Sequence, residues 1–348
     1  MEDEDYDVDQ AWTEFCENGN IGECSEVPLR SKSPTNLPKC SDIYISTKTK
    51  IAYLSDQIDL ETIFWQLEIL GYHVPKEGIV KKQMKFNSIN EEKVEEINNK
   101  LKDYQNADVQ IINRIINPTG RVKFKDIRKI SIGLCQKDIT SYRSKKRSAF
   151  YNCFVLILRI KDNSKFKEIH VKVFNTGKLE IPGIRDDVIL QNTLDLLINI
   201  LNKYRKSPLT YDLSKTETVL INSNFNCGYF INRDKLLDIL KYKYHISCIF
   251  DACQYPGIQC KYDYQDDKTG TLYQLSFMIF RTGSILIVGK CNEETLYNVY
   301  ENIKLILETE YKNIFVQNVE SQLKDTVKKK KIKKKIITID INLPGQIS

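Results

Sequence analysis

The sequence lacks any apolar run long enough to cross a membrane, which takes about 20 residues. The longest such run, Cys153 to Leu158, has only the length of a strand. The N-terminus, MEDEDYDVD, is acidic and resembles neither a secretory signal nor a transit peptide. We therefore expect an intracellular chain without a membrane partner.

Metal ligands and catalytic pairs are also scarce. The ten cysteines form no CxxC pair and there are only three histidines, whereas a structural zinc site needs paired ligands at short spacing. Cys248, Cys253 and Cys260 come nearest, but their spacing suits no zinc finger. We interpret the cysteines as reduced packing residues. With no phosphate loop and no paired-carboxylate motif, we expect no metal, no cofactor, no small-molecule substrate and no enzymatic activity.

Charge of both signs is present, but it is segregated along the chain. Residues 1–29 hold ten acidic residues and no Lys or Arg, while residues 321–348 hold eight Lys and two Asp. The net charge of +6 therefore conceals a basic body, which suits either a polyanionic partner or an ordinary solvated surface. We interpret 1–40 as an acidic disordered head. In the basic tail, 317–348, the lysine run either binds nucleic acid, acts as a nuclear address or is simply solvated.

An internal repeat organises the body of the chain. FNTGKLEIPG (174–183) recurs as FRTGSILIVG (280–289), and both predict a strand, a tight turn at the first Gly and a second strand. Each copy is followed by an amphipathic helix, with Leu190, Leu194, Leu197 and Leu201 on one face of the first and Leu296, Val299, Ile303 and Leu307 on one face of the second.

The elements upstream of these hairpins repeat as well. Strands are predicted at 153–160 and 257–264, and short helices at 59–70 and 232–240. The unit is a strand, a short helix, several antiparallel strands and a long helix, and it occurs at 41–205 and 218–316 with a linker at 206–217. Residues of about 72–138 have no counterpart. Because Val94, Ile97, Leu101 and Tyr104 share a helical face there, we expect a helical insert, with a partner site as one role for it.

The order of these elements resembles the core of the TATA-box-binding protein family, over roughly 200 residues. The matching segments are IDLETI (58–63), FVLILRI (154–160), YPGIQCKY (255–262), FRTGSILIVGK (280–290) and ENIKLIL (301–307). The acidic head, the long insert and the AT-biased composition resemble a giant-virus version, from a nucleocytoplasmic large DNA virus. The resemblance implies an α+β fold: a two-repeat saddle made of a curved antiparallel sheet with helices on its convex face.

The resemblance also implies a function and partners. A member of this family is a transcription initiation factor that binds and bends A·T-rich promoter DNA, a double-stranded partner, through the minor groove. The base edges in that groove distinguish little more than A·T from G·C. Recognition in this family therefore relies on apolar wedges and on how easily the duplex kinks. The other implied partners are a factor-IIB-like protein and a viral RNA polymerase. The implied location is a viral factory in the host cytoplasm or the host nucleus, with packaging in the virion as a further option.

Two other functions are open to such a chain. It could be a repurposed protein-interaction module of the viral transcription machinery that has lost TATA-specific binding. A DNA glycosylase with a related repeat fold would need a helix-hairpin-helix and a catalytic Lys and Asp downstream. Only a charged tail follows residue 316, which disfavours the enzyme.

The family's apolar DNA contacts map onto several positions, each with core packing as the alternative role. The wedges are Phe174, Phe280, Tyr255 and Phe154, and small apolar groups at the groove are Leu286 and Val288. Phe154 is the least clear of these, because counting back from Arg159 reaches Cys153. Tyr255 departs from the family's Phe, and its hydroxyl makes it a poorer wedge.

Polar contacts map less evenly, with ordinary solvated side chains as the alternative. Arg159 and Lys261 match backbone-contacting positions, and Lys178, Arg185 and Lys290 lie beside the turns, within reach of phosphates. The family places an Asn on the first strand of each repeat. Thr49, Asn222 and Asn224 lie near those sites, although the register puts Thr47 and Leu220 on them.

Repeat one departs from the family where it would face the groove. Glu180 and Pro182 stand where repeat two has Leu286 and Val288. Phosphates would repel the carboxylate, and we expect Lys172 on the neighbouring strand to offset it. Repeat two should therefore keep the better DNA face. Of the acidic residues that contact the factor-IIB-like protein in the family, only Asp251 remains.

Overall fold

The computed structural model describes residues 38–140, 152–266, 268 and 270–317. The predicted acidic head and basic tail, including the lysine run, lie almost entirely outside the described residues. The described chain forms two compact units, which we call the first-repeat unit (50–217) and the second-repeat unit (38–49 with 218–317). The boundary falls inside strand β1 (Tyr44–Tyr53), between Thr49 and Lys50.

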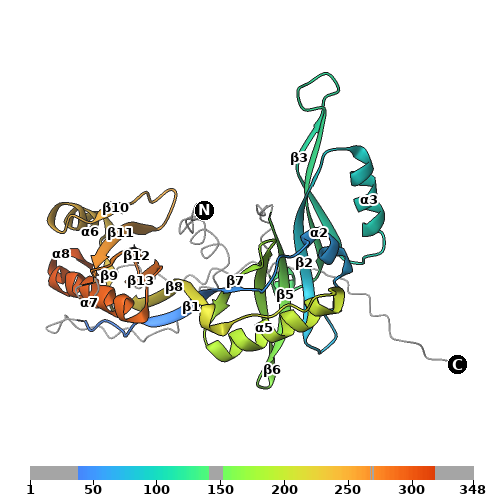
Figure 1. Cartoon of the computed structure of the whole chain (residues 1–348). Helices are drawn as coiled ribbons and strands as arrows, with labels where there is room; N and C mark the ends of the chain where they lie inside the picture. The colour runs from blue at the N-terminus through green and yellow to red at the C-terminus, as the bar shows by residue number, and fades with distance from the viewer. Residues whose placement is uncertain (1–37, 141–151, 267, 269, 318–348) are drawn as a thin grey trace, which may run out of the picture. The chain divides into compact units, whose positions relative to one another are not determined.

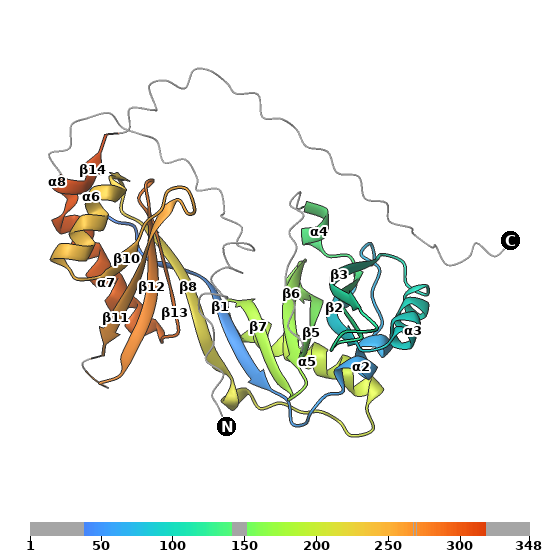
Figure 2. The ribbon, with the colours of Figure 1, turned by 90° about the horizontal axis from the view of Figure 1, so that it is seen from above.

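The first-repeat unit contains an antiparallel sheet in the order β1-β7-β6-β5-β2-β4-β3. Its further strands are β2 (Gly78–Ser88), β3 (Ala107–Ile116), β4 (Phe124–Gly133), β5 (Cys153–Asp162), β6 (Lys165–Phe174) and β7 (Lys178–Ile184). Its helices are α2 (Leu60–Gln66), α3 (Glu91–Leu101), α4 (Gln136–Thr140) and α5 (Asp187–Leu201). Helix α5 crosses one face of this sheet (Figures 1 and 2).

The second-repeat unit contains an antiparallel sheet in the order β8-β13-β12-β11-β10. These strands are β8 (Glu217–Asn226), β10 (Ser247–Ile249), β11 (Gly257–Gln265), β12 (Leu272–Phe280) and β13 (Ser284–Gly289). A separate pair joins β9 (Phe230–Ile231) to β14 (Phe315–Val316). The helices are α6 (Arg233–Asp238), which runs into a π-helical turn at Ile239–Lys243, α7 (Glu293–Thr309) and α8 (Tyr311–Ile314).

The two units repeat one topology, as the sequence predicted. In each, an opening strand, a short helix, a further strand, a three-stranded meander and a long helix follow in that order. The sheet orders β1-β7-β6-β5-β2 and β8-β13-β12-β11-β10 are equivalent. Gly177 and Gly283 occupy matching turns, with φ of 85° and 81°, and each accepts a backbone bond of 2.9 Å from its opening segment, from Leu54 and Cys227 respectively. The expected α+β class and internal repeat are confirmed.

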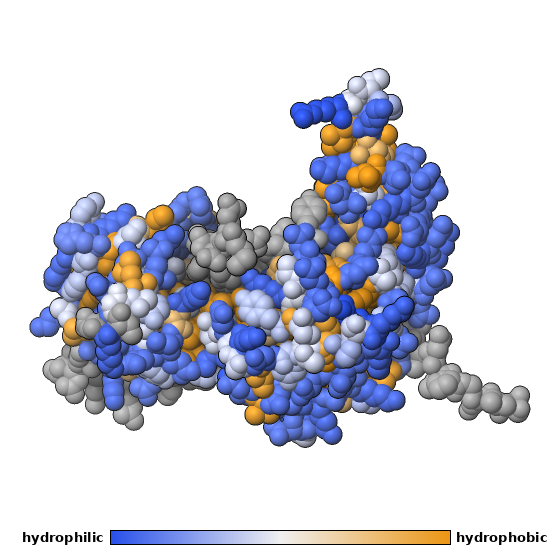
Figure 3. All heavy atoms as spheres, in the orientation of Figure 1, coloured by the Kyte–Doolittle hydropathy of each residue, from blue (hydrophilic) through white to orange (hydrophobic). Residues whose placement is uncertain are grey.

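The insert contains the predicted helix, but it also contains strands that the sequence did not predict. Helix α3 is present, with Val94 and Ile97 buried, but β2, β3 and β4 lie in the same stretch. The β-branched residues of ADVQIINRII favour strand over helix. Apolar side chains gather on the surface near β3 (Figure 3), where Val109, Ile111 and Ile116 are 39%, 53% and 55% exposed.

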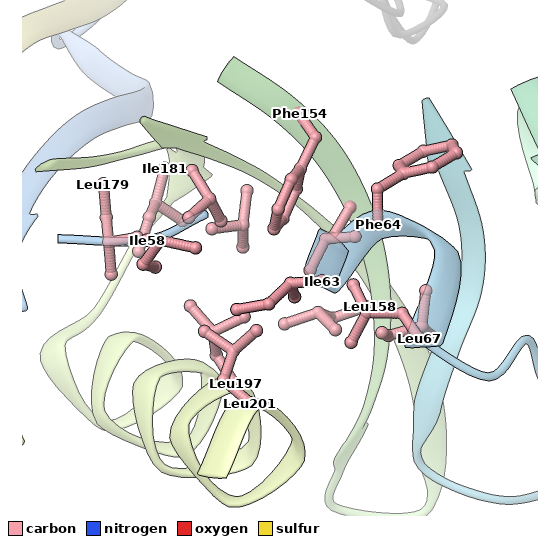
Figure 4. Close-up of a cluster of buried hydrophobic side chains, with 14 of the residues drawn as sticks. Ile58, Ile63, Phe64, Leu67, Phe154, Leu158, Leu179, Ile181, Leu197 and Leu201 are labelled. Carbon is pink, nitrogen blue, oxygen red and sulfur yellow. The ribbon is translucent and has the colours of Figure 1, made fainter. Parts of the chain in front are cut away.

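Helices α2 and α5 of the first-repeat unit, and α6 and α7 of the second, cover one and the same side of their sheets. In the first, Phe154, Leu158 and Leu179 point toward Ile63 of α2 and Leu197 of α5 (Figure 4). In the second, alternate strand residues pack against Leu236 of α6 and against α7, whose buried residues include Leu296, Val299 and Ile303. We call the opposite side of each sheet the open face. Among the described residues, no helix has the length and apolar character needed to cross a membrane.

Both long helices begin at a capping residue, close to a lysine of β1. Asp186 accepts a backbone bond from Ile189 at 2.8 Å, and Asn292 accepts one from Thr295 at 2.7 Å, which satisfies N–H groups that a helix start leaves without partners. Both first turns are acidic, with Asp187 in α5 and with Glu293 and Glu294 in α7. Lys50 lies 3.1 Å from Asp187 and Lys48 lies 2.6 Å from Glu293, so β1 supplies a cation to the first turn of each long helix.

Candidate nucleic-acid interface

The open face of the second-repeat unit brings several predicted contacts into cross-strand rows. Ile285 and Ile287 are in the core, so Leu286 and Val288 point to the open face, because successive strand residues alternate. One row runs through Asn222, Val288, Ser276 and Lys261, and the next through Asn224, Leu286, Met278 and Gln259. Amide and apolar side chains thus stand side by side, with Lys261 at the outer end of the first row.

Accessibility differs sharply within these rows. Asn224 and Leu286 are partly exposed, whereas Asn222 and Val288 are buried. Asn222 donates its amide N–H to the Thr47 hydroxyl at 3.1 Å, and among the described residues its buried Oδ1 has no hydrogen-bond partner. Thr49 is buried as well. The row of Asn224 and Leu286 is therefore the more accessible one.

An aromatic pair lies at one end of this face. The rings of Phe280 and Tyr255 are 5.9 Å apart and inclined by 57°, and both residues are partly exposed. Gly257 is paired with Phe280 across the ladder, and a Cβ on Gly257 would lie 3.1 Å from that ring. The aromatic-Pro-Gly sequence therefore leaves room for Phe280 to lie over the neighbouring strand.

The first-repeat unit presents a related but altered face. Leu179 and Ile181 are fully buried, which directs Lys178, Glu180 and Pro182 to the open face. Lys178 Nζ lies 5.9 Å from the centre of the partly exposed Phe174 ring. Glu180 is directly opposite Lys172, and their charged groups are 2.9 Å apart. The expected compensation of Glu180 by Lys172 is confirmed.

Phe154 does not lie on the open face. It is fully buried, together with Leu156 and Leu158, and its ring points into the core beneath the sheet (Figure 4). The neighbouring Cys153 is the residue that faces the open side, directly opposite Phe174. Assigning Phe154 as a wedge is wrong by one residue, because a shift of one position reverses the face of a strand residue.

Arg159 is on the open side of β5 but is already engaged there. Its guanidinium donates to the carbonyl oxygens of Tyr72 and Val74 at 3.0 and 2.9 Å, lies 4.7 Å from the Tyr72 ring centre and is only 6% exposed. Glu168 is 3.8 Å away. The phosphate contact expected of Arg159 is contradicted by this burial, and its role is structural.

Helix α4 of the insert covers this end of the open face. Cys135, just before α4, packs on Val80 and Ile157, and Asp138 binds Lys81 through both carboxylate oxygens at 2.8 Å. Burial raises the pKa of the Cys135 thiol to about 11, which leaves it protonated and poorly nucleophilic. The exposed part of the face is therefore the end that carries Phe174.

The remaining predicted contacts lie at the margins. Arg185 and Lys290 are exposed just after β7 and β13, as expected for residues beside the turns. Asp251 is exposed, and its carboxylate accepts the backbone N–H of Cys253 at 2.9 Å. Cys248 and Cys260 are paired across β10 and β11. No group of three possible metal ligands occurs in the part of the chain that the structure describes.

Met278 and Gln259 are members of the second row that sequence reasoning missed. Met278 is 4% exposed, and Gln259 is exposed in the strand that also carries Lys261. Counting in steps of two from Lys261 and from Phe280 would have placed both on the open face.

Comparison with known proteins finds similarity to this chain both in sequence and in structure. No family model matches the chain. The chain is 28% identical over 213 residues to a protein described as TATA-box-binding protein-like from Acanthamoeba polyphaga mimivirus, and the match covers 54% of this chain. The chain spans 56% of that relative's length. A solved structure of Methanococcus jannaschii TBP matches with a TM-score of 0.37 and 12% identity, over 77% of this chain and 99% of that one. The family resemblance expected from the motifs is thus confirmed as sequence similarity to a TATA-box-binding protein-like protein of a giant virus.

Proposed function

We propose that this chain is a non-enzymatic transcription initiation factor that binds promoter DNA in the minor groove and bends it. The observation that carries the proposal is the row of Asn224 and Leu286 beside Phe280 on one open face. Minor-groove edges offer acceptors that an amide N–H can reach, and apolar contact tolerates the little sequence code there. An aromatic side chain at the end of such a face is placed to wedge between base pairs.

The charge distribution supports a nucleic-acid partner. Lys261 ends one row, while Lys178, Arg185 and Lys290 border the two open faces. Lysine and arginine at the rim of an apolar surface bind phosphates, which positions the duplex without reading its sequence. The factor would act where the virus transcribes its genes, in a viral factory or in the host nucleus. A factor-IIB-like protein near Asp251 and a viral RNA polymerase are its proposed protein partners.

A second function, a protein-interaction module without TATA-specific binding, has specific support. Glu180 places a carboxylate on the open face of the first-repeat unit, and Arg159 is bound within the fold. Both features remove positive charge from a face that would approach phosphates. The second-repeat unit does not share them, so we favour DNA binding that depends mostly on its face.

The test is a salt series with two duplexes of equal length, one with an A·T-rich element and one without. The logarithm of the affinity should fall linearly with the logarithm of the salt concentration, because neutralised phosphates release counterions. The A·T-rich duplex should bind more tightly and should bend. Salt-dependent binding that does not prefer the A·T-rich duplex would contradict promoter recognition but would still support DNA binding. No salt-dependent binding to either duplex would favour the interaction module.

A further inference from the structure

The insert extends the sheet of the first-repeat unit past the strand where the second repeat ends. β10 is the last strand of the second-repeat sheet, whereas its equivalent β2 is followed by β4 and then β3. Figure 1 shows β3 at this end of the unit with α3 beside it. The sheet of the first-repeat unit therefore has two more strands than that of the second, and these strands extend its open face.

The face of each added side chain follows from contacts on β4. Ile130 and Ile132 are in the core, and Arg128 donates to Asn98 of α3 at 2.8 Å. Even-numbered residues of β4 therefore point to the helix side, and Lys129 and Lys125 point to the open side. On β2, Phe86 is in the core, which leaves Lys85 on the open side.

The open side of the insert is rich in lysine and amide groups. Lys85 lies directly opposite Lys129, which in turn lies opposite Gln110, and all three are partly exposed. Lys125 is the next lysine on the open side of β4, four residues before Lys129, with the buried Ile127 between them. Gln83, Asn87 and Asn113 occupy neighbouring open-face positions. On the open side of the described strands β2, β3 and β4, Asp108 is the one acidic residue. Positive charge is concentrated here.

This surface is continuous with the candidate DNA face in the same unit. Cys153 pairs with Phe174, and Met84 pairs with Phe154, so Lys85 comes next to Cys153. One cross-strand row thus leads from Phe174 through Cys153 and Lys85 to Lys129. At about 4.8 Å per strand the backbone of Lys129 lies about 14 Å from that of Phe174, which is about four base-pair steps along a duplex.

We propose that the open face of β2, β4 and β3 binds the phosphate backbone of the same duplex, beside the part contacted by the repeat. This inference rests on the proposed function. Lysines and side-chain amides suit phosphate contacts, which are independent of base sequence. The insert would lengthen the bound site and strengthen its salt dependence without changing which bases are recognised.

The test compares two double variants of the full chain. Lys85→Gln with Lys129→Gln removes two positive charges from the open face. Lys100→Gln with Lys102→Gln removes two from α3 and the residue after it, on the helix side of the same unit. Affinity for the A·T-rich duplex is measured across a salt series, with bending and thermal unfolding measured alongside.

We expect the open-face variant to lower the slope of log affinity against log salt by about 2, at about 0.9 per lost phosphate contact, with bending unchanged. The α3 variant should retain the wild-type slope. The inference is overturned if the open-face variant folds and keeps the wild-type slope. It is also overturned if this variant binds DNA more tightly than the wild type, which would indicate that the lysines bind an acidic protein segment instead. In both cases the proposed function stands. A wild-type chain that binds no duplex overturns both.

Discussion

The sequence predicted a DNA contact for both Phe280 and Arg159, but their surroundings in the structure differ. Phe280 is partly exposed beside Tyr255, and Arg159 is buried with two carbonyl acceptors. We expect Phe280→Ala to reduce DNA bending, because the wedging ring is lost. Arg159→Ala should leave bending unchanged and lower the free energy of unfolding by about 1–3 kcal/mol, since two hydrogen bonds from a buried guanidinium are lost.

Energy transfer between dyes at the two duplex ends reports the bend, and urea unfolding reports stability. Equal bending by the wild type and Phe280→Ala would remove the wedge role. A weaker bend in Arg159→Ala, with unchanged stability, would restore Arg159 to the interface.

Lys82 gives the fold a pH dependence. Its ammonium donates to the Phe64 and Leu67 carbonyls at 2.7 Å each, and burial lowers its pKa from 10.5 to about 8. Between these values the unfolded state binds more protons, so the contribution of Lys82 to stability rises with pH, by at most about 3 kcal/mol.

Lys82→Met should lack this contribution. Urea unfolding at pH 7.5, 9 and 10.5 measures the free energy of unfolding of both proteins, and the wild-type value minus the variant value should increase over this series. Taking the difference cancels the titration of tyrosines and other groups common to both. A constant difference would show that Lys82 keeps its ordinary pKa in the folded chain, and a falling one that its pKa is raised there; either result contradicts the prediction.

At the scale of elements, the turn of the first hairpin depends on the absence of a side chain. Gly177 and Gly183 share a φ of 85°, but a Cβ on Gly177 would lie 2.6 Å from the Asp56 carbonyl oxygen, whereas one on Gly183 would meet no heavy atom within 4 Å. We expect Gly183→Ala to cost about 1–2 kcal/mol from backbone strain alone. Gly177→Ala should cost at least about 1 kcal/mol more.

Thermal or urea unfolding of the two glycine variants makes this comparison at matched backbone strain. Equal losses would mean that the loop at Asp56 moves aside without cost. That result would also mean that the stability of the hairpin turn does not depend on its close packing against the opening segment, although the Leu54 N–H donates to the Gly177 carbonyl.

Elements with one buried face could be predicted from sequence, and elements without one could not. Helices α5 and α7 show a clear apolar stripe and an acidic first turn. Strand β3 is exposed over most of its length and has a bulge between Ile111 and Asn113, so neither period appears in it. Only the helix of the insert could therefore be predicted from the sequence.

The side of β5 that faces the helices could not be predicted from the sequence either, for the opposite reason. Both sides of this strand are apolar, because Val155 and Ile157 alternate with Phe154 and Leu156. Alternation therefore cannot show which set faces the helices. The partners of Arg159 are the carbonyls of Tyr72 and Val74, more than 80 positions away in sequence, and no local pattern could reveal them.

At the scale of the whole molecule, the two units make unequal contributions to the proposed interface. The second-repeat unit combines Asn224, Leu286 and Phe280 on its open face. In the first-repeat unit the ion pair of Lys172 and Glu180 neutralises one positive charge at the equivalent place. Repeat one therefore retains the topology of the proposed DNA-binding face but less of the charge and apolar surface that repeat two has there.

This inequality predicts that Glu180 weakens DNA binding. Glu180→Gln removes the carboxylate, which is repelled by phosphates and neutralises Lys172. We expect tighter duplex binding and a slope of log affinity against log salt that is steeper by about 1, the equivalent of one more phosphate contact. Lys172→Gln is the matched control, and it should weaken binding because Glu180 then remains without its cation. Unchanged affinity in both variants would mean that the open face of repeat one does not approach the duplex, and that the second-repeat unit binds DNA alone.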